Sequence, residues 1–120
     1  MENKNLSQKK CGPCENGQKP METSEIMEHS GQTPNWDVVE DKKLHKHYDF
    51  KNFKEVREFT KKVCDLADEE GHHPDICFSF NYVDVSIMTH SIGGLSENDF
   101  ILASKIDRID SPQPKENSEK

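Results

Sequence analysis

The clearest pattern of apolar and polar positions lies in residues 52–70. Apolar side chains recur there at three- and four-residue steps, which places them on one face of a helix: Phe53, Val56, Phe59, Val63, Leu66 and Ala67. Asn52 and Glu55 have the spacing of an N-terminal capping box, and Gly71 is placed to end the helix. The pattern therefore predicts one long amphipathic helix packed on a core.

Alternating patterns on both sides of this helix predict four β-strands. Residues 36–39 and 44–50 form the first hairpin, with the turn at residues 40–43. Residues 76–82 and 83–90 alternate in the same way and form the second hairpin. Strands of this kind bury one face and expose the other, so the helices are expected on a single side of the sheet.

Two further helices complete the pattern. Ser96 and Asp99 have capping-box spacing, and an apolar stripe continues from there to Ile109. A short helix over residues 21–29 is also predicted. The order (α)ββαββα indicates an α+β fold in which a four-stranded, largely antiparallel sheet carries its helices on one face.

The same pattern sets the domain organisation. Residues 34–110 are predicted to form the domain, and residues 1–33 a polar leader that is partly flexible and contains the short helix. Residues 111–120 hold two prolines and no apolar side chain, so a disordered tail is expected. A core of roughly 77 residues buries little surface on its own, and we therefore expect a homodimer or homotetramer.

The net charge and the hydropathy of the chain limit the kinds of partner that the protein is expected to bind. The net charge is −7, and residues 34–110 hold 10 Lys and Arg against 16 Asp and Glu. This balance lacks the basic footprint of nucleic-acid binding. No apolar run approaches the length of a membrane span, and no secretory signal is visible at the N-terminus. We therefore expect a cytoplasmic protein whose four cysteines are reduced.

Cys11 and Cys14 form a Cys-x-x-Cys motif. The same spacing occurs in thioredoxin-like redox sites, but these need a buried strand before the motif, and the preceding residues here are polar. A zinc site would need two more ligands at suitable spacing. Cys64 lies within the long predicted helix, where we expect a small, at least half-buried side chain.

The candidate chemistry lies between Asp68 and Asp99, where three histidines, His72, His73 and His90, fall within 19 residues. Histidine exchanges protons near neutral pH, so such a group can supply both an acid and a base. In an antiparallel sheet the start of one strand neighbours the end of the next. The three histidines can therefore meet at one end of the sheet, as a proton-transfer site.

Other interpretations of these histidines stay open. Three histidines could bind zinc, although adjacent side chains diverge when the backbone is extended. A His-His pair is also common on ordinary surfaces. Asp99 already has a structural explanation, because it is the acid of the second capping box.

The spacing of these residues resembles the signature of the pterin-4a-carbinolamine dehydratase family. The resemblance runs from Trp36 to about Ile109 and rests on Asp68, His72, His73, Pro74, Phe80, His90 and Asp99. It implies dehydration of a 4a-hydroxytetrahydropterin to a quinonoid dihydropterin, which recycles the pterin after aromatic amino-acid hydroxylation. It implies no metal and no organic cofactor, since the pterin is the substrate.

The resemblance also implies roles for single residues. His72 and His90 would flank the pterin ring as acid/base catalysts, and His73 would orient it with a share in proton transfer. The substrate-binding positions would be Pro74, Thr89, Ser91 and Asp99, the last of which would also set a histidine tautomer. A second possibility is a protein-binding regulator on the same scaffold, of the coactivator kind known among animal members.

Overall fold

A computed structural model describes residues 5–12 and 18–109 of the chain. Its α-helices and strands follow the predicted order: α1 (Thr23–Ser30), β1 (Asp37–Val39), β2 (Lys43–Asp49), α2 (Phe53–Glu70), β3 (Asp75–Phe78), β4 (Tyr82–Ile87) and α3 (Glu97–Ile106). Two short 3-10 turns, η1 (Leu6–Gln8) and η2 (His90–Ile92), were not predicted. The α+β fold class is therefore confirmed. The disordered tail predicted at residues 111–120, like Cys14, lies outside the described residues.

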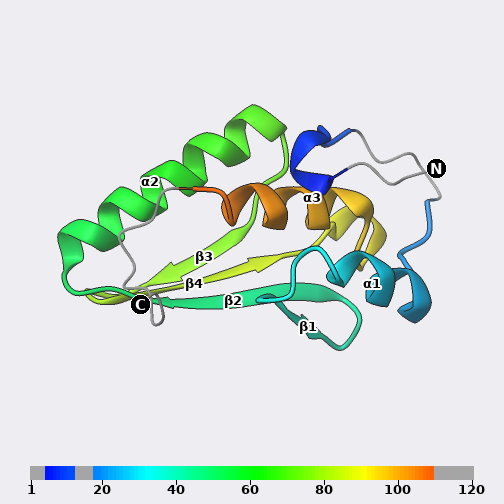
Figure 1. The fold of residues 1–120 in the computed structure, drawn as a ribbon, viewed down its shortest axis with the longest axis horizontal. Helices are drawn as coiled ribbons and strands as arrows, with labels where there is room; N and C mark the ends of the chain where they lie inside the picture. Colours follow the sequence, from blue (N-terminus) through cyan, green and yellow to red (C-terminus); the bar gives the residue numbers. More distant parts are fainter. Residues whose placement is uncertain (1–4, 13–17, 110–120) are drawn as a thin grey trace.

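The four strands form one sheet in the order β1-β2-β4-β3, and every neighbouring pair is antiparallel. The helices α2 and α3 lie over one face of this sheet (Figure 1). The strand β4 is central and alternates as predicted, since Val83, Val85 and Ile87 are fully buried toward the helices. The order leaves β1 and β3 as the two edges.

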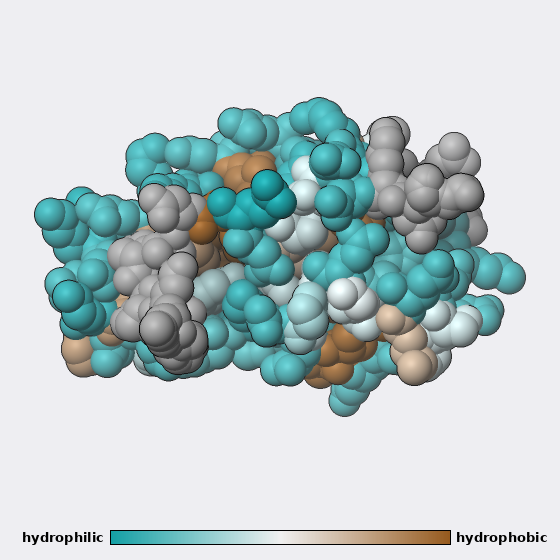
Figure 2. Space-filling view, in the orientation of Figure 1, coloured by the Kyte–Doolittle hydropathy of each residue, from teal (hydrophilic) through white to brown (hydrophobic). Residues whose placement is uncertain are grey.

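The core extends toward the N-terminus beyond residue 34. Leu6 of η1 and Ile26 of α1 are each 2% exposed and belong to the same hydrophobic cluster as the sheet. The surface in Figure 2 is mostly hydrophilic, with hydrophobic side chains in small separate areas. No helix within residues 5–12 and 18–109 is long and apolar enough to cross a bilayer.

The turn between β1 and β2 forms without glycine. Glu40 and Asp41 both adopt left-handed backbone angles, with φ of 55° and 57°. The Lys42 N–H donates a hydrogen bond to the Val39 carbonyl at 2.9 Å. These features describe a primed β-turn, here adopted by two acidic residues, within a three-residue connection, because the register pairs Val39 with Lys43.

Several elements differ from the sequence prediction. The second hairpin is shorter than expected, since β3 ends at Phe78 and β4 at Ile87. Phe78 at the end of the edge strand β3 and Phe80 in the connection that follows are both exposed. The prediction that Cys64 is at least half-buried was wrong, because the residue lies one step around α2 from the buried Val63 and faces solvent.

Candidate functional site

The end of α2 positions the histidine pair. Gly71 adopts a left-handed conformation with φ of 68°, and its N–H closes the helix on the Ala67 carbonyl at 2.9 Å. The chain then turns through His72 and His73 toward Pro74, which favours an extended backbone before it. The pair therefore lies in a short loop between α2 and the start of β3.

The third histidine lies just beyond the end of β4. Thr89 forms an isolated bridge with Gly94, and the chain between them makes the short turn η2, which begins at His90. The register pairs Asp75 with Ser86, so the start of β3 lies beside the end of β4. The two histidine-bearing segments thus meet at one end of the sheet, although His90 belongs to a turn and not to the strand.

A cavity of about 360 Å³ lies between these segments. Its lining includes five of the seven predicted site residues, namely His72, His73, Thr89, His90 and Ser91. Pro74 and Asp99 are not part of that lining. The remaining lining residues, which were not singled out as site residues, are Gly12, Gly71, Met88 and Asn98.

Asp99 lies directly behind His72. It is fully buried, and its Oδ1 accepts a hydrogen bond from His72 Nε2 at 2.6 Å. Its Oδ2 accepts from Thr89 Oγ1 and from the Ser96 N–H, both at 2.8 Å. One carboxylate therefore caps α3 with one oxygen and holds the histidine with the other.

This contact defines the free nitrogen of His72. An ionised carboxylate only accepts hydrogen bonds, so His72 Nε2 must carry the proton that it shares with Asp99. The His72 side chain is 13% exposed, and its Nδ1 is the nitrogen left to exchange a proton. The arrangement suits a general acid/base whose tautomer is fixed by a buried acid.

The other two histidines are much more open. The side chains of His73 and His90 are 65% and 69% exposed. The Nε2 of His73 lies 3.4 Å from Asp68 Oδ1, and the Nε2 of His90 lies 3.9 Å from Asp75 Oδ2. Exposed pairs of this kind contribute little stability. Asp68, which had no specific role in the sequence argument, thus lies beside His73.

A buried ion pair supports the end of α2. Glu70 is 8% exposed, and its carboxylate accepts from Lys105 Nζ at 2.6 Å and from the Cys11 N–H at 3.0 Å. Burial acts to raise the pKa of Glu70, but these two donors outweigh it and hold the pKa below its ordinary value. The last turn of α2, immediately before His72, is thereby tied to α3.

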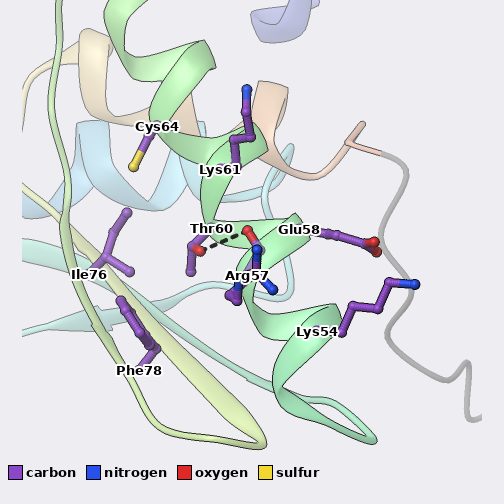
Figure 3. Close-up of a pocket in the computed structure, with 8 residues that line it drawn as sticks. All are labelled: Lys54, Arg57, Glu58, Thr60, Lys61, Cys64, Ile76 and Phe78. Atoms are coloured by element: carbon purple, nitrogen blue, oxygen red, sulfur yellow. Dashed lines mark hydrogen bonds between the residues drawn. The ribbon is translucent and has the colours of Figure 1, made fainter.

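A larger cavity, about 470 Å³, lies between α2 and β3 (Figure 3). Ile76 and Phe78 line its β3 side, while the charged ends of Lys54, Glu58 and Lys61 point away from them. Among the described residues, its lining holds no histidine and a single carboxylate, that of Glu58. The smaller cavity is therefore the better candidate for acid/base chemistry.

Within residues 5–12 and 18–109, no three His, Cys, Asp or Glu side chains are grouped to hold a metal ion.

Comparison with known proteins agrees with the geometry. The family model for pterin 4 alpha carbinolamine dehydratase matches residues 19–109. The chain belongs to this family. A relative from Rubrobacter xylanophilus is 40% identical over 104 residues, which cover 87% of this chain and 97% of the relative. A relative from Rickettsia bellii is 47% identical over 105 residues, covering 87% and 93%. Both are named provisionally as pterin-4-alpha-carbinolamine dehydratases.

A solved structure shares the fold. It is described as a transcriptional coactivator/pterin dehydratase from Brucella melitensis, and it superposes with a TM-score of 0.69 at 28% sequence identity. The alignment covers 74% of this chain and 96% of the Brucella chain. The fold and family predicted from the sequence are thus confirmed.

Proposed function

We propose that this chain is a cytoplasmic dehydratase that converts a 4a-hydroxytetrahydropterin to the quinonoid dihydropterin. The observation that carries the proposal is the cavity lined by His72, His73 and His90, with His72 held by the buried Asp99. Family membership supplies the substrate class. In a cell the reaction would return the pterin for further aromatic amino-acid hydroxylation.

The reaction needs one proton donor and one proton acceptor. The C4a–O bond breaks, and the oxygen leaves as water after it receives a proton from the acid. The base removes the proton from N5, and the N5 electron pair forms the new C4a=N5 double bond. We assign these two tasks to His72 and His90, which come from different segments of the cavity wall.

The remaining site residues would bind the pterin or shape its site. His73 would orient the ring and share in proton transfer, while Thr89 and Ser91 would bind the pterin from the lining beside His90. Asp99 would act through His72 by fixing its tautomer. Pro74 would act by setting the course of the loop, because it is not part of the cavity lining.

A stopped-flow assay with a 4a-hydroxytetrahydropterin tests the proposal. Substitution of either His72 or His90 by alanine should lower the dehydration rate by about 10²–10⁴-fold. His45→Ala is the matched control, since His45 lies on β2 outside the cavity lining. A His72→Ala, His90→Ala double variant that works at the wild-type rate would falsify the assignment. Activity that is lost on exhaustive chelation and restored by zinc would favour the metal alternative.

A protein-binding regulator is the second candidate. The Brucella structure is described as a coactivator as well as a dehydratase. The exposed phenylalanines Phe53, Phe78 and Phe80, which are 45%, 50% and 65% exposed, are the feature that favours it. On this alternative the double histidine variant would leave the function intact, whereas changes at the phenylalanines would remove it.

We also propose that the chain self-associates through the β3 edge. Within the part of the chain that the structure describes, β3 is an edge strand that pairs with β4, and an edge strand can pair with a second strand on its other side. Phe78 and Phe80 lie exposed along or just beyond this strand, and the ring of Phe53 from α2 lies 6.2 Å from that of Phe78. A second copy of the chain would cover these side chains and enlarge the small core.

A further inference from the structure

The segment of residues 6–12, which we call the N-terminal strap, lies against the main domain. Its first residues form the turn η1, which lies beside α3 (Figure 1). Leu6 is 2% exposed in the core, and its backbone N–H donates to Gln32 Oε1 at 2.9 Å. The strap is thus built into the fold at its start.

Three polar anchors hold the other end of the strap. Lys9 Nζ lies 2.6 Å from Glu97 Oε2, and the Cys11 N–H donates to Glu70 as described above. Asn98 then forms two hydrogen bonds with the backbone of Gly12, which we call the Asn98 clasp. Its Oδ1 accepts from the Gly12 N–H at 3.0 Å, and its Nδ2 donates to the Gly12 carbonyl at 2.6 Å.

Two of the residues that hold the strap, Glu70 and Asn98, are close in sequence to the hydrogen-bonded pair of the histidine cavity. Glu70 is the last residue of α2, two residues before His72, and Asn98 precedes Asp99 in the first turn of α3. The strap therefore joins the two chain segments that carry the two ends of the His72–Asp99 hydrogen bond. Both Gly12 and Asn98 also line the cavity itself.

We propose that the N-terminal strap is a wall of the pterin site and that Asn98 is a positioning residue that holds Gly12 at the cavity. The inference rests on the proposed function, since it concerns the binding of the same pterin. It assigns the leader a part in ligand affinity, where the sequence offered only redox or zinc chemistry for its cysteine motif.

The state of Cys11 agrees with a packing role. Burial, reinforced by the nearby Glu70, raises the pKa of the Cys11 thiol to about 12. Its Sγ lies 3.5 Å from the Asn98 carbonyl, to which it donates a weak hydrogen bond. A protonated, half-buried thiol reacts slowly, so its alkylation rate reports whether the strap is docked.

Two variants distinguish an effect of strap docking on ligand binding from a direct contact between Asn98 and the ligand. Asn98→Ala removes the clasp on Gly12 but also alters the cavity lining. Lys9→Ala weakens the docking from outside the lining, so its effect on the ligand must pass through the strap. Lys46→Ala is the matched control: it removes the 3.1 Å ion pair between β2 and Asp107, likewise outside the lining.

The measurements are the Kd of a stable 7,8-dihydropterin by fluorescence titration, and KM and kcat for the 4a-hydroxytetrahydropterin. Lys9→Ala should raise Kd and KM by about two- to fivefold, the range that a part-exposed ion pair implies. Asn98→Ala should raise both by about three- to thirty-fold, since two hydrogen bonds are lost, and kcat should change less than about twofold in either variant. Lys46→Ala should leave Kd unchanged.

Cys11 alkylation by iodoacetamide, measured with the other three cysteines replaced by serine, should be faster in Lys9→Ala. By linkage, saturating dihydropterin should slow it in the otherwise unchanged chain. The inference is overturned if Cys11 reacts faster in Lys9→Ala while Kd stays at the wild-type value. A rise in Kd for Asn98→Ala alone would likewise overturn it, by making Asn98 a direct ligand contact. A wild-type chain that binds no dihydropterin would instead refute the proposed function itself.

Discussion

The Asp99 carboxylate has two tasks: it belongs to the capping box of α3, and it holds His72. The substitution Asp99→Asn separates them. In the wild type, Oδ2 meets two donors, from Ser96 and Thr89, while Oδ1 meets only His72. An asparagine has one acceptor oxygen, and that oxygen satisfies more donors at the Oδ2 position. We therefore expect the amide nitrogen to face His72 Nε2, with the cap of α3 preserved.

This orientation predicts a large loss of catalytic rate and a small loss of stability. His72 Nε2 must then accept a hydrogen bond from the amide, which moves the ring proton to Nδ1 and removes the free electron pair with which Nδ1 would accept a proton. The rate should fall by about 10²–10⁴-fold, the size expected for the loss of one acid/base group. The free energy of unfolding should fall by only about 1 kcal/mol, because the cap remains.

Asp99→Ala provides the contrast. It removes the Asp99 half of the capping box, while the N-cap Ser96 stays in place. It also leaves the buried donors of His72, Thr89 and Ser96 without their acceptor, at about 1–3 kcal/mol each. Its total loss of stability should therefore be about 3 kcal/mol or more. Asn52→Ala is the matched control for capping alone, because Asn52 Oδ1 accepts the Glu55 N–H at the start of α2, outside the cavity lining. It should lose stability without losing activity.

Three measurements test whether Asp99 acts on His72 as well as on α3. Urea unfolding gives the stability, stopped-flow dehydration gives the rate, and the ¹⁵N shifts of the His72 ring give its tautomer. The ring nitrogens should report a change from the Nε2–H to the Nδ1–H tautomer in Asp99→Asn. If this variant keeps both the wild-type rate and the wild-type tautomer, Asp99 is a helix cap and nothing more.

Three further predictions concern other parts of the fold. Because the pKa of Glu70 is lowered on folding, its charge stabilises the protein above its ordinary pKa of 4.5, and that stabilisation is lost as the pH falls through the lower folded pKa. The difference in unfolding free energy between wild type and Glu70→Gln should thus shrink below about pH 4.5, and a pH-independent difference would contradict this. The carboxylate of Asp84, through its hydrogen bond, is the largest cause of the raised pKa of His47. Asp84→Asn should lower the His47 pKa in an NMR titration, and an unchanged pKa would exclude that cause. If β3 is an interface, the Phe78→Ser, Phe80→Ser double variant should lower the mass in light scattering; an unchanged mass in a folded variant would place the interface elsewhere.

The order of elements could be predicted from sequence because local patterns determine it. The helical stripe of α2 and the alternation of β4 each bury one face, and both appear where the periodicity placed them. The exact ends could not be predicted. Strand β4 stops at Ile87 because Thr89 pairs with Gly94 across η2, and that contact is not visible in the alternation, which continues to His90.

The candidate site divides in the same way. The meeting of His72, His73 and His90 follows from the antiparallel order of two short strands, so the sequence could predict it. The contribution of Gly12 could not be predicted, because it depends on a docked segment without periodicity. In the sequence, Leu6 is an apolar residue among polar ones, and a composition-based interpretation assigns it to a polar leader. In the fold it is buried and begins the docked segment.

Asp99 shows why a structural explanation of a residue does not exclude a functional one. The capping box accounted for the residue completely at the level of sequence, because capping needs only one acceptor oxygen. A carboxylate has two, and full burial of Asp99 requires that the second also find a donor. In this fold that donor is His72 Nε2. The start of α3 and the orientation of the histidine are therefore coupled, so changes that shift the first turn of α3 should reach the cavity through Asp99.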